Sequence, residues 1–340
     1  MEMLAVSRYR TILLVVTVVL LTWGVLGALD IRHQTYTGYV TDGNNTITQV
    51  TEGSPADAAG LATGDYIRRI GGIPVEDVSA GAQRGRPKIG EVRTFEIERK
   101  GRALSFDLSY VALPTNVALV GYAGVLIGLM FLVCGVWAFV AAPSKRTLLL
   151  SVLGIAFSPG FSVGPYFTSA AVRTAVGLVI LLMVIVGFAV LTHFLLVFPQ
   201  PKRTLTARTM TWAVYGPAVV VASLTAWLLV AQPPATSGLN VFFRALLGLV
   251  VVGYFGASLI ALIHSYVRAD ARHRAANGLT LLLLGAVVGL GPWFVVALVG
   301  LIAPQVVIPG ARLFLPLSVV VLPLTLAIAA VRGERSAQTA

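Results

Sequence analysis

Three side chains in the apolar part of the chain are of types that could carry out chemistry: Ser162, His193 and His264. Ser162 is the centre of a Gly-x-Ser-x-Gly motif at residues 160–164, which in hydrolases holds a nucleophilic serine on a strand-to-helix turn. That chemistry needs a sheet, an acid and a histidine around the serine, whereas this motif lies at the end of an apolar stretch. We therefore interpret it as a chance match in a loop that follows a helix.

His193 and His264 each precede the end of an apolar stretch by a few residues, so we expect them at similar depth in a membrane. Two facing imidazoles can hold a haem, and one can ligate another macrocycle, such as a chlorophyll. The alternative is that each histidine bonds to a neighbouring helix or lies at the membrane surface. The sequence predicts no cofactor, and a haem- or chlorophyll-type ligand at these two residues is the alternative.

Residues for other chemistry are absent from the sequence. After Asp107 the only carboxylates are Asp270 and Glu334, and both lie outside the apolar stretches. Because transport of ions and intramembrane proteolysis by aspartates need ionisable groups within the membrane, both are disfavoured. The chain has no His-Glu-x-x-His motif, and its single cysteine, Cys134, excludes a multi-cysteine metal site. We predict no catalytic residue, no metal site and no enzymatic activity.

The composition predicts an α-helical polytopic membrane bundle. The chain is 57% hydrophobic and only 11% charged, whereas soluble domains are about one-quarter charged. Stretches of 18 or more apolar residues can cross a bilayer as helices, and about eight are present. They cover residues 11–29, 115–142, 147–166, 173–198, 209–231, 239–267, 278–303 and 313–331.

The basic residues predict the orientation, since lysine and arginine in short loops stay on the cytoplasmic side. Outside residues 30–112, twelve basic residues fall in alternate connections and at the two ends, against three elsewhere. The net charge of +11 therefore reflects topology and contact with anionic lipids rather than nucleic-acid binding. The predicted domains are a cytoplasmic N-terminus, an uncleaved signal anchor, one non-cytoplasmic domain, a seven-helix bundle and a cytoplasmic tail. They cover residues 1–10, 11–29, 30–112, 113–331 and 332–340.

The segment 30–112 has a soluble composition, with 11 of the 14 acidic residues. Ser54 is placed to cap a short helix that starts at Pro55, and Gly60 to end it. Alternating apolar residues on both sides of Lys100-Gly101 are typical of a hairpin. These features predict a small α+β domain inserted between the first and second spans.

This segment resembles the core of bacterial PDZ domains, as found in periplasmic serine proteases and site-2 proteases. The resemblance rests on the pattern V-x-x-G-S-P-A-x-x-A-G-L-x-x-G-D-x-I-x-x-I-x-G-x-P-V within residues 36–110. It implies that an extended peptide adds to a sheet edge, with Gly38, Tyr39, Val40 and Thr41 as the carboxylate-binding loop and Ile47 in the following strand. The second groove wall would be a helix within residues 78–88, although Gly81, Gly85 and Pro87 weaken it. The alternative is a PDZ fold used only as a spacer or docking surface.

A second resemblance is shorter. Residues 191–203, with the sequence LTHFLLVFPQPKR, resemble the end of a helix in the multi-span sensor regions of bacterial histidine kinases. Those proteins continue into a kinase or phosphatase domain, whereas this sequence ends soon after the eighth apolar stretch.

Together these features predict a non-enzymatic, receptor-like or scaffold protein of a bacterial inner membrane. The PDZ-like domain would be periplasmic and would bind a periplasmic or membrane-anchored protein, while the bundle would contact lipids and other membrane subunits. The alternative is an accessory subunit of a larger energy-converting complex that contains a pigment or haem. No nucleic-acid partner is expected.

Overall fold

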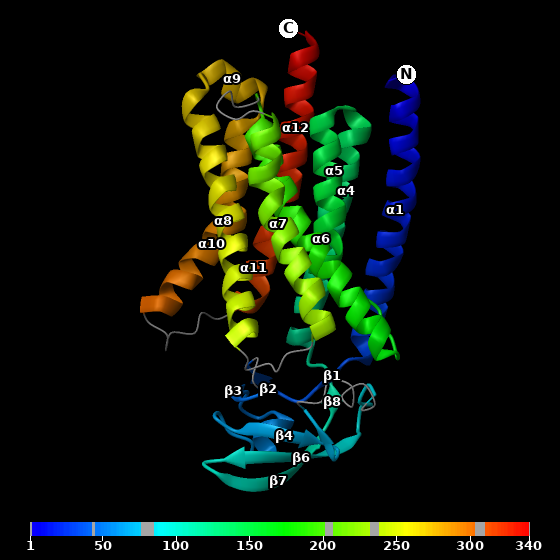
Figure 1. Cartoon of the computed structure of the whole chain (residues 1–340), viewed down its shortest axis with the longest axis vertical. Coiled ribbons are helices and arrows are strands. Elements are labelled where there is room, and N and C mark those ends of the chain that lie inside the picture. Colours follow the sequence, from blue (N-terminus) through cyan, green and yellow to red (C-terminus); the bar gives the residue numbers. More distant parts are fainter. Residues whose placement is uncertain are drawn as a thin grey trace.

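A computed structural model of the chain describes residues 2–42, 45–75, 85–200, 207–231, 238–302 and 310–339. A bundle of long helices carries a small β-rich domain at one end, and both termini lie at the other end (Figure 1). The bundle helices are α1 (Glu2–Asp30), α4 (Thr115–Ala141), α5 (Lys145–Phe161), α6 (Ala170–Val197), α7 (Ala207–Ala231), α8 (Gly238–Arg268), α10 (Leu279–Ile302), α11 (Ala311–Val319) and α12 (Val321–Thr339). The short helix α9 (Ala271–Ala276) connects α8 to α10 at the end that holds the termini.

The predicted count of about eight spans is not confirmed. All eight apolar stretches contain helix, but within the described ranges six helices are long and apolar enough to cross a membrane. The stretch 147–166 falls short because α5 has 17 residues, or about 25 Å of helix against a hydrocarbon core of about 30 Å. Within the stretch 278–303, α10 runs from Leu279 to Ile302, and Leu279–Trp293 is its described apolar part.

Small residues bring α4 and α5 into close contact. A side chain at Gly135 would lie 2.6 Å from the carbonyl oxygen of Leu150, and one at Gly124 would lie 2.6 Å from that of Phe161. Gly154 of α5 meets the backbone of Phe131 in the same way. The Gly124-x-x-x-Gly128 step thus allows close approach of α4, and α5 is its partner.

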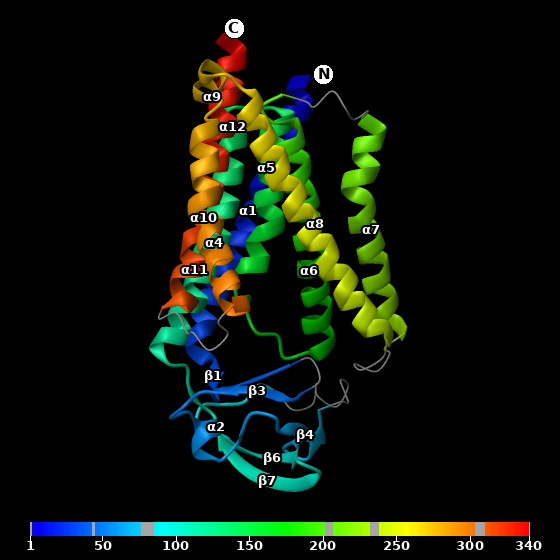
Figure 2. The ribbon, with the colours of Figure 1, turned by 90° about the vertical axis from the view of Figure 1, so that its left-hand side faces the viewer.

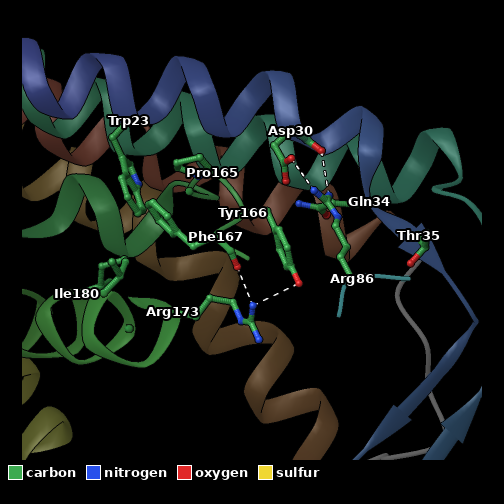
Figure 3. Close-up of a pocket in the computed structure, with 13 residues that line it drawn as sticks. Trp23, Asp30, Gln34, Thr35, Arg86, Pro165, Tyr166, Phe167, Arg173 and Ile180 are labelled. Atoms are coloured by element: carbon green, nitrogen blue, oxygen red, sulfur yellow. Dashed lines mark hydrogen bonds and ion pairs between the residues drawn. The ribbon is translucent and has the colours of Figure 1, made fainter. Parts of the chain in front are cut away.

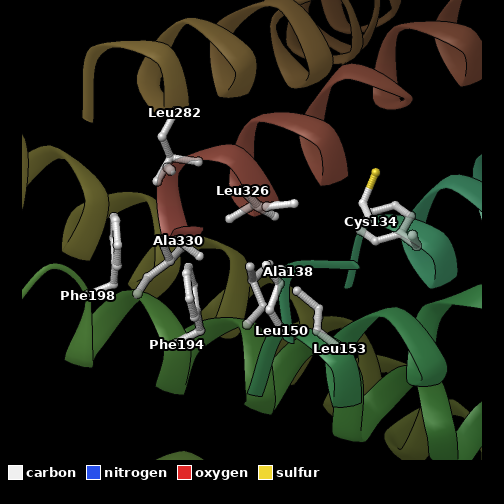
Figure 4. Close-up of a cluster of buried hydrophobic side chains, with 14 of the residues drawn as sticks. Cys134, Ala138, Leu150, Leu153, Phe194, Phe198, Leu282, Leu326 and Ala330 are labelled. Carbon is white, nitrogen blue, oxygen red and sulfur yellow. The ribbon is translucent and has the colours of Figure 1, made fainter. Parts of the chain in front are cut away.

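The largest buried cluster lies where α4, α5, α6, α8, α10 and α12 meet (Figure 4). The aromatic rings of Phe194 and Phe198 stack at a centroid distance of 5.2 Å, and Leu282 and Leu326 are buried beside them. Cys134 is buried in the same cluster, as its apolar sequence context predicts. Helix α7 packs at the periphery against α6 and α8, as the turned view shows (Figure 2).

A tyrosine of α8 bridges an interruption in the backbone hydrogen bonds of α7. Pro217 lies inside α7 and lacks an N–H, so the hydrogen-bond ladder is broken there. The Tyr254 hydroxyl accepts a bond from the Ala218 N–H at 3.1 Å and donates one to the Val214 carbonyl at 2.5 Å. In a regular helix this N–H and this carbonyl would bond to each other, so the hydroxyl acts as a wedge in the ladder.

We expect Tyr254→Phe to lower the stability of the bundle by about 1–3 kcal/mol, because it leaves two buried backbone groups without the bridging hydroxyl. The measurement is the thermal midpoint of the detergent-solubilised protein. Tyr122→Phe is the matched control, since Tyr122 is 37% exposed on α4. Equal midpoints for the two variants would show that the wedge contributes no stability.

The β-rich domain contains three small sheets. Strands β2 (Tyr39–Thr41) and β3 (Ile47–Val50) pair antiparallel, and a second sheet has the order β5 (Ile73–Pro74), β4 (Tyr66–Ile70), β6 (Val92–Arg99), β7 (Arg102–Ser109). The third pairs β1 (Thr35–Tyr36) with β8 (Val111–Ala112), so the chain enters and leaves the domain side by side. The 3₁₀ turn η1 (Ile31–His33) links α1 to β1.

Local sequence explains one helix start and one turn in this domain. The Ser54 hydroxyl accepts a bond from the Asp57 N–H, while the Asp57 carboxylate accepts one from the Gly53 N–H, so both cap the short helix α2 (Pro55–Ala58). Lys100 and Gly101 both have positive φ, which suits a two-residue turn between β6 and β7. The predicted helix cap and hairpin are confirmed.

Candidate peptide-binding site

The candidate site is the edge of strand β2 that no other described strand covers. Among the described strands, β2 pairs only with β3, and β3 is joined on its far side to β4 by the Thr46–Tyr66 bridge. A strand with one unpaired edge can accept an extended peptide through backbone hydrogen bonds. Strands β2 and β3 lie on the bundle side of the domain (Figure 1), and in both views β7 lies farthest from the bundle (Figures 1 and 2).

Gly38 fixes the start of this edge. Its φ of +87° is a conformation that favours glycine, and an added Cβ would collide with the side chain of Ser54. Its carbonyl accepts a bond from the Thr51 N–H at 2.8 Å, and the Thr37 carbonyl accepts one from the Ala56 N–H at 2.9 Å. The beginning of β2 is therefore held against the start of α2.

The predicted site residues divide into two groups. Tyr39 is half-buried and meets the ring of Phe95 edge-on at 5.8 Å, Val40 is 50% exposed, and Thr41 is half-buried. These three residues make up β2, and Gly38 directly precedes them. Ile47 is 1% exposed and belongs to the domain core, so its side chain supports β2 from beneath.

The predicted second wall of the groove, the helix within residues 78–88, lies for the most part outside the described residues. Only residues 85–88 of this range are described, and they are not helical. The helix itself therefore stays a prediction.

An ion pair between Asp65 and Arg99, which no local sequence pattern indicates, lies next to strand β3 of the site. Asp65 has a fully buried carboxylate that accepts bonds from Arg99 Nε at 2.6 Å, Arg99 Nη2 at 2.7 Å and the Ala62 N–H at 2.8 Å. Burial alone raises the pKa of Asp65, but the bonds from Arg99 and Ala62 outweigh it and hold this pKa below its usual value. The Asp65 carbonyl also accepts a bond from the Ile47 N–H at 2.8 Å, which ties the ion pair to β3.

A second ion pair fixes the domain to the bundle. Arg86 donates to the Asp30 carboxylate at the end of α1 at 2.6 Å, and both side chains are largely buried. The same guanidinium lies 4.8 Å from the centre of the Tyr166 ring, which belongs to the connection between α5 and α6. Together with the β1–β8 pair, these contacts hold the β2 edge close to the bundle.

Ser162 is placed as a structural residue. It follows the last residue of α5, is buried, and its hydroxyl donates to the Ser158 carbonyl at 2.8 Å. The surrounding residues lie in helices and a loop, not in the strand-to-helix turn that a nucleophilic serine requires.

The structure does not bring His193 and His264 into a shared buried site. His193 Nδ1 lies 2.9 Å from the Tyr215 hydroxyl of α7, whereas His264 is exposed on α8. Within the described ranges, no group of three or more His, Cys, Asp or Glu side chains could hold a metal ion. The macrocycle alternative stays a prediction, and an absorption spectrum of the purified protein before and after reduction tests it.

Comparison with known protein families gives a match within the β-rich domain. Residues 46–99 match the PDZ domain family. This range contains strands β3 to β6 and the Asp65–Arg99 ion pair. No curated protein matches the chain. The chain therefore contains a PDZ domain, a module that suggests protein–protein interaction, and its six long apolar helices fit a membrane protein.

Proposed function

We propose that this chain is a non-enzymatic, receptor-like or scaffold protein of a bacterial inner membrane. Its PDZ domain binds an extended segment of a periplasmic or membrane-anchored protein at the β2 edge, and its bundle contacts lipids and other subunits in the membrane. The observation that carries the proposal is strand β2, which has β3 on one edge and no other described strand on its second edge, and which lies on the bundle side of a PDZ domain. A partner anchored in the same membrane can reach that side with a short extended segment.

Features of the bundle support the second half of the proposal. Leu249, Val252 and Ile260 of α8 are each about 70% exposed, so this helix presents an apolar face to lipid or to another membrane protein. The Ser162 hydroxyl bonds to the Ser158 carbonyl, so the Gly-x-Ser-x-Gly motif gives no support for a hydrolase.

We expect Val40→Lys to reduce partner capture about tenfold, because a lysine on an edge strand opposes strand addition and removes an apolar contact. The measurement is affinity purification of the tagged full-length chain after cross-linking in native membranes. Val40 is 50% exposed, so the variant is expected to fold.

Leu104→Lys provides the matched control for this prediction. Leu104 is 37% exposed on β7, an edge strand of the four-stranded sheet. Loss of capture with Leu104→Lys but not with Val40→Lys would move the binding site to β7. Capture unchanged by either variant, and by deletion of residues 36–110, would contradict a binding role for the domain.

A further inference from the structure

A cavity of about 460 Å³ lies where the PDZ domain meets the bundle. The last turns of α1, the connection between α5 and α6, the first turns of α6 and Arg86 of the domain form its walls (Figure 3). Gly27 and Gly164 allow α1 to lie directly on this connection, because a side chain at Gly27 would collide with the Val163 carbonyl and one at Gly164 with the Trp23 ring. The cavity therefore has closely packed walls on that side.

The end of the cavity next to the domain is positively charged. Arg86 and Arg173 line it with one carboxylate, Asp30, which leaves an excess of one positive charge. Both guanidinium groups lie over the Tyr166 ring, at 4.8 Å and 5.2 Å from its centre. Such an environment favours an anion.

The guanidinium of Arg173 bonds to the described residues through only one of its three nitrogens. Its bonds to the Tyr166 hydroxyl (3.3 Å), the Phe167 carbonyl (2.7 Å) and the Thr168 carbonyl (2.8 Å) are all made by Nη1. In the described part of the chain, Nε and Nη2 have no protein acceptor. These two nitrogens form the edge of a guanidinium that binds a phosphate through two parallel bonds.

The other end of the cavity is apolar. Val176, Gly177 and Ile180 follow Arg173 by three, four and seven residues, so they lie on the same face of α6, and all line the cavity. Trp23 and Phe167 form the facing wall with their rings stacked at 6.0 Å. A side chain built at Gly177 would meet nothing within 4 Å, so the space beside it is open.

We propose that this cavity binds an anionic phospholipid, with its phosphate on Arg173 and its acyl chain along Val176 and Ile180. The polar and apolar ends follow each other along α6 in the order that a lipid head group and chain require. The site lies where α1 ends and α6 begins, which is the depth of the head groups if these helices span the bilayer. A bound lipid would become part of the contact between the domain and the bundle.

The test measures binding to the purified full-length protein in a non-ionic detergent. The probes are a short-chain phosphatidylglycerol, inorganic phosphate, and a diacylglycerol with the same chains as the first probe. Arg173→Gln removes the charge, and Gly177→Leu places an apolar side chain at the apolar end, where the Cβ meets nothing within 4 Å. The matched controls are Arg102→Gln at the exposed β6–β7 turn and Gly248→Leu on α8, where an added side chain also meets nothing.

We expect Arg173→Gln and Gly177→Leu each to weaken phosphatidylglycerol binding at least about tenfold, and the two controls to leave it unchanged. Inorganic phosphate and diacylglycerol should each bind more weakly than phosphatidylglycerol. Phosphate that binds as tightly as the lipid, with no effect of Gly177→Leu, would identify a free-phosphate site and overturn the proposal. Equal binding of lipid to the wild type and to both cavity variants would also overturn it.

Discussion

Gly154→Val should prevent the native packing of α4 on α5. Any side chain at Gly154 meets the backbone of Phe131, and backbone atoms cannot rotate out of the way as a flexible side chain can. The helices must therefore separate, and the buried cluster that includes Phe131, Leu153 and Phe157 loses contacts. Overpacking of this kind costs about 1–3 kcal/mol or more.

The expected result is a large loss of monodisperse protein after detergent extraction, measured by size-exclusion chromatography with a fluorescent fusion. Gly216→Val is the matched control, since a side chain at Gly216 of α7 meets nothing within 4 Å. A normal elution profile and yield for Gly154→Val would show that the two helices do not pack through this glycine.

Asp65→Asn should open the PDZ domain while the bundle stays folded. The substitution removes the charge that pairs with Arg99 and leaves an amide that cannot accept both guanidinium bonds and the Ala62 bond. Breaking a buried pair costs about 3 kcal/mol, somewhat less where one partner is partly exposed, as Arg99 is. Hydrogen–deuterium exchange in β4 and β6 should accelerate by about 100-fold.

Asp107→Asn is the control for this variant, because Asp107 is exposed and an asparagine keeps an acceptor for its Thr94 bond. The effect should also depend on pH. Since the pKa of Asp65 is lowered in the folded state, its contribution is fully present above the unfolded pKa of about 3.9 and is lost as the pH falls through the folded pKa. The stability difference between wild type and Asp65→Asn should thus shrink in acid, and a difference that grows there would contradict the ion pair.

Features set by neighbouring residues could be predicted from the sequence. The Ser54 cap, the Lys100-Gly101 turn and the apolar helices depend on short windows of sequence, and all are present in the structure. The Gly124-x-x-x-Gly128 step is also a local pattern, of the kind that permits close helix packing, but the pattern does not identify α5 as the partner.

Contacts between distant residues could not be predicted. Arg86 and Asp30 are 56 residues apart, Arg99 and Asp65 are 34 apart, and no local pattern distinguishes these charged residues from other charged residues of the domain. The Tyr254 wedge could not be predicted for the same reason, since Pro217 marks where the ladder of α7 is interrupted but not which residue bridges it.

Orientation in the membrane is the claim on which the proposed function most depends. The PDZ domain and the termini lie at opposite ends of the bundle, so we expect them on opposite sides of the membrane (Figure 1). Single cysteines can test this after Cys134, which is buried, is replaced by alanine. Arg102→Cys marks the β6–β7 turn and Gln338→Cys marks the exposed end of α12.

The measurement is labelling of spheroplasts of a bacterial expression host with a membrane-impermeant maleimide. Arg102→Cys should react in intact spheroplasts, and Gln338→Cys should react only after the membrane is permeabilised. Labelling of Gln338→Cys but not Arg102→Cys in intact spheroplasts would place the PDZ domain in the cytoplasm and contradict the proposed function.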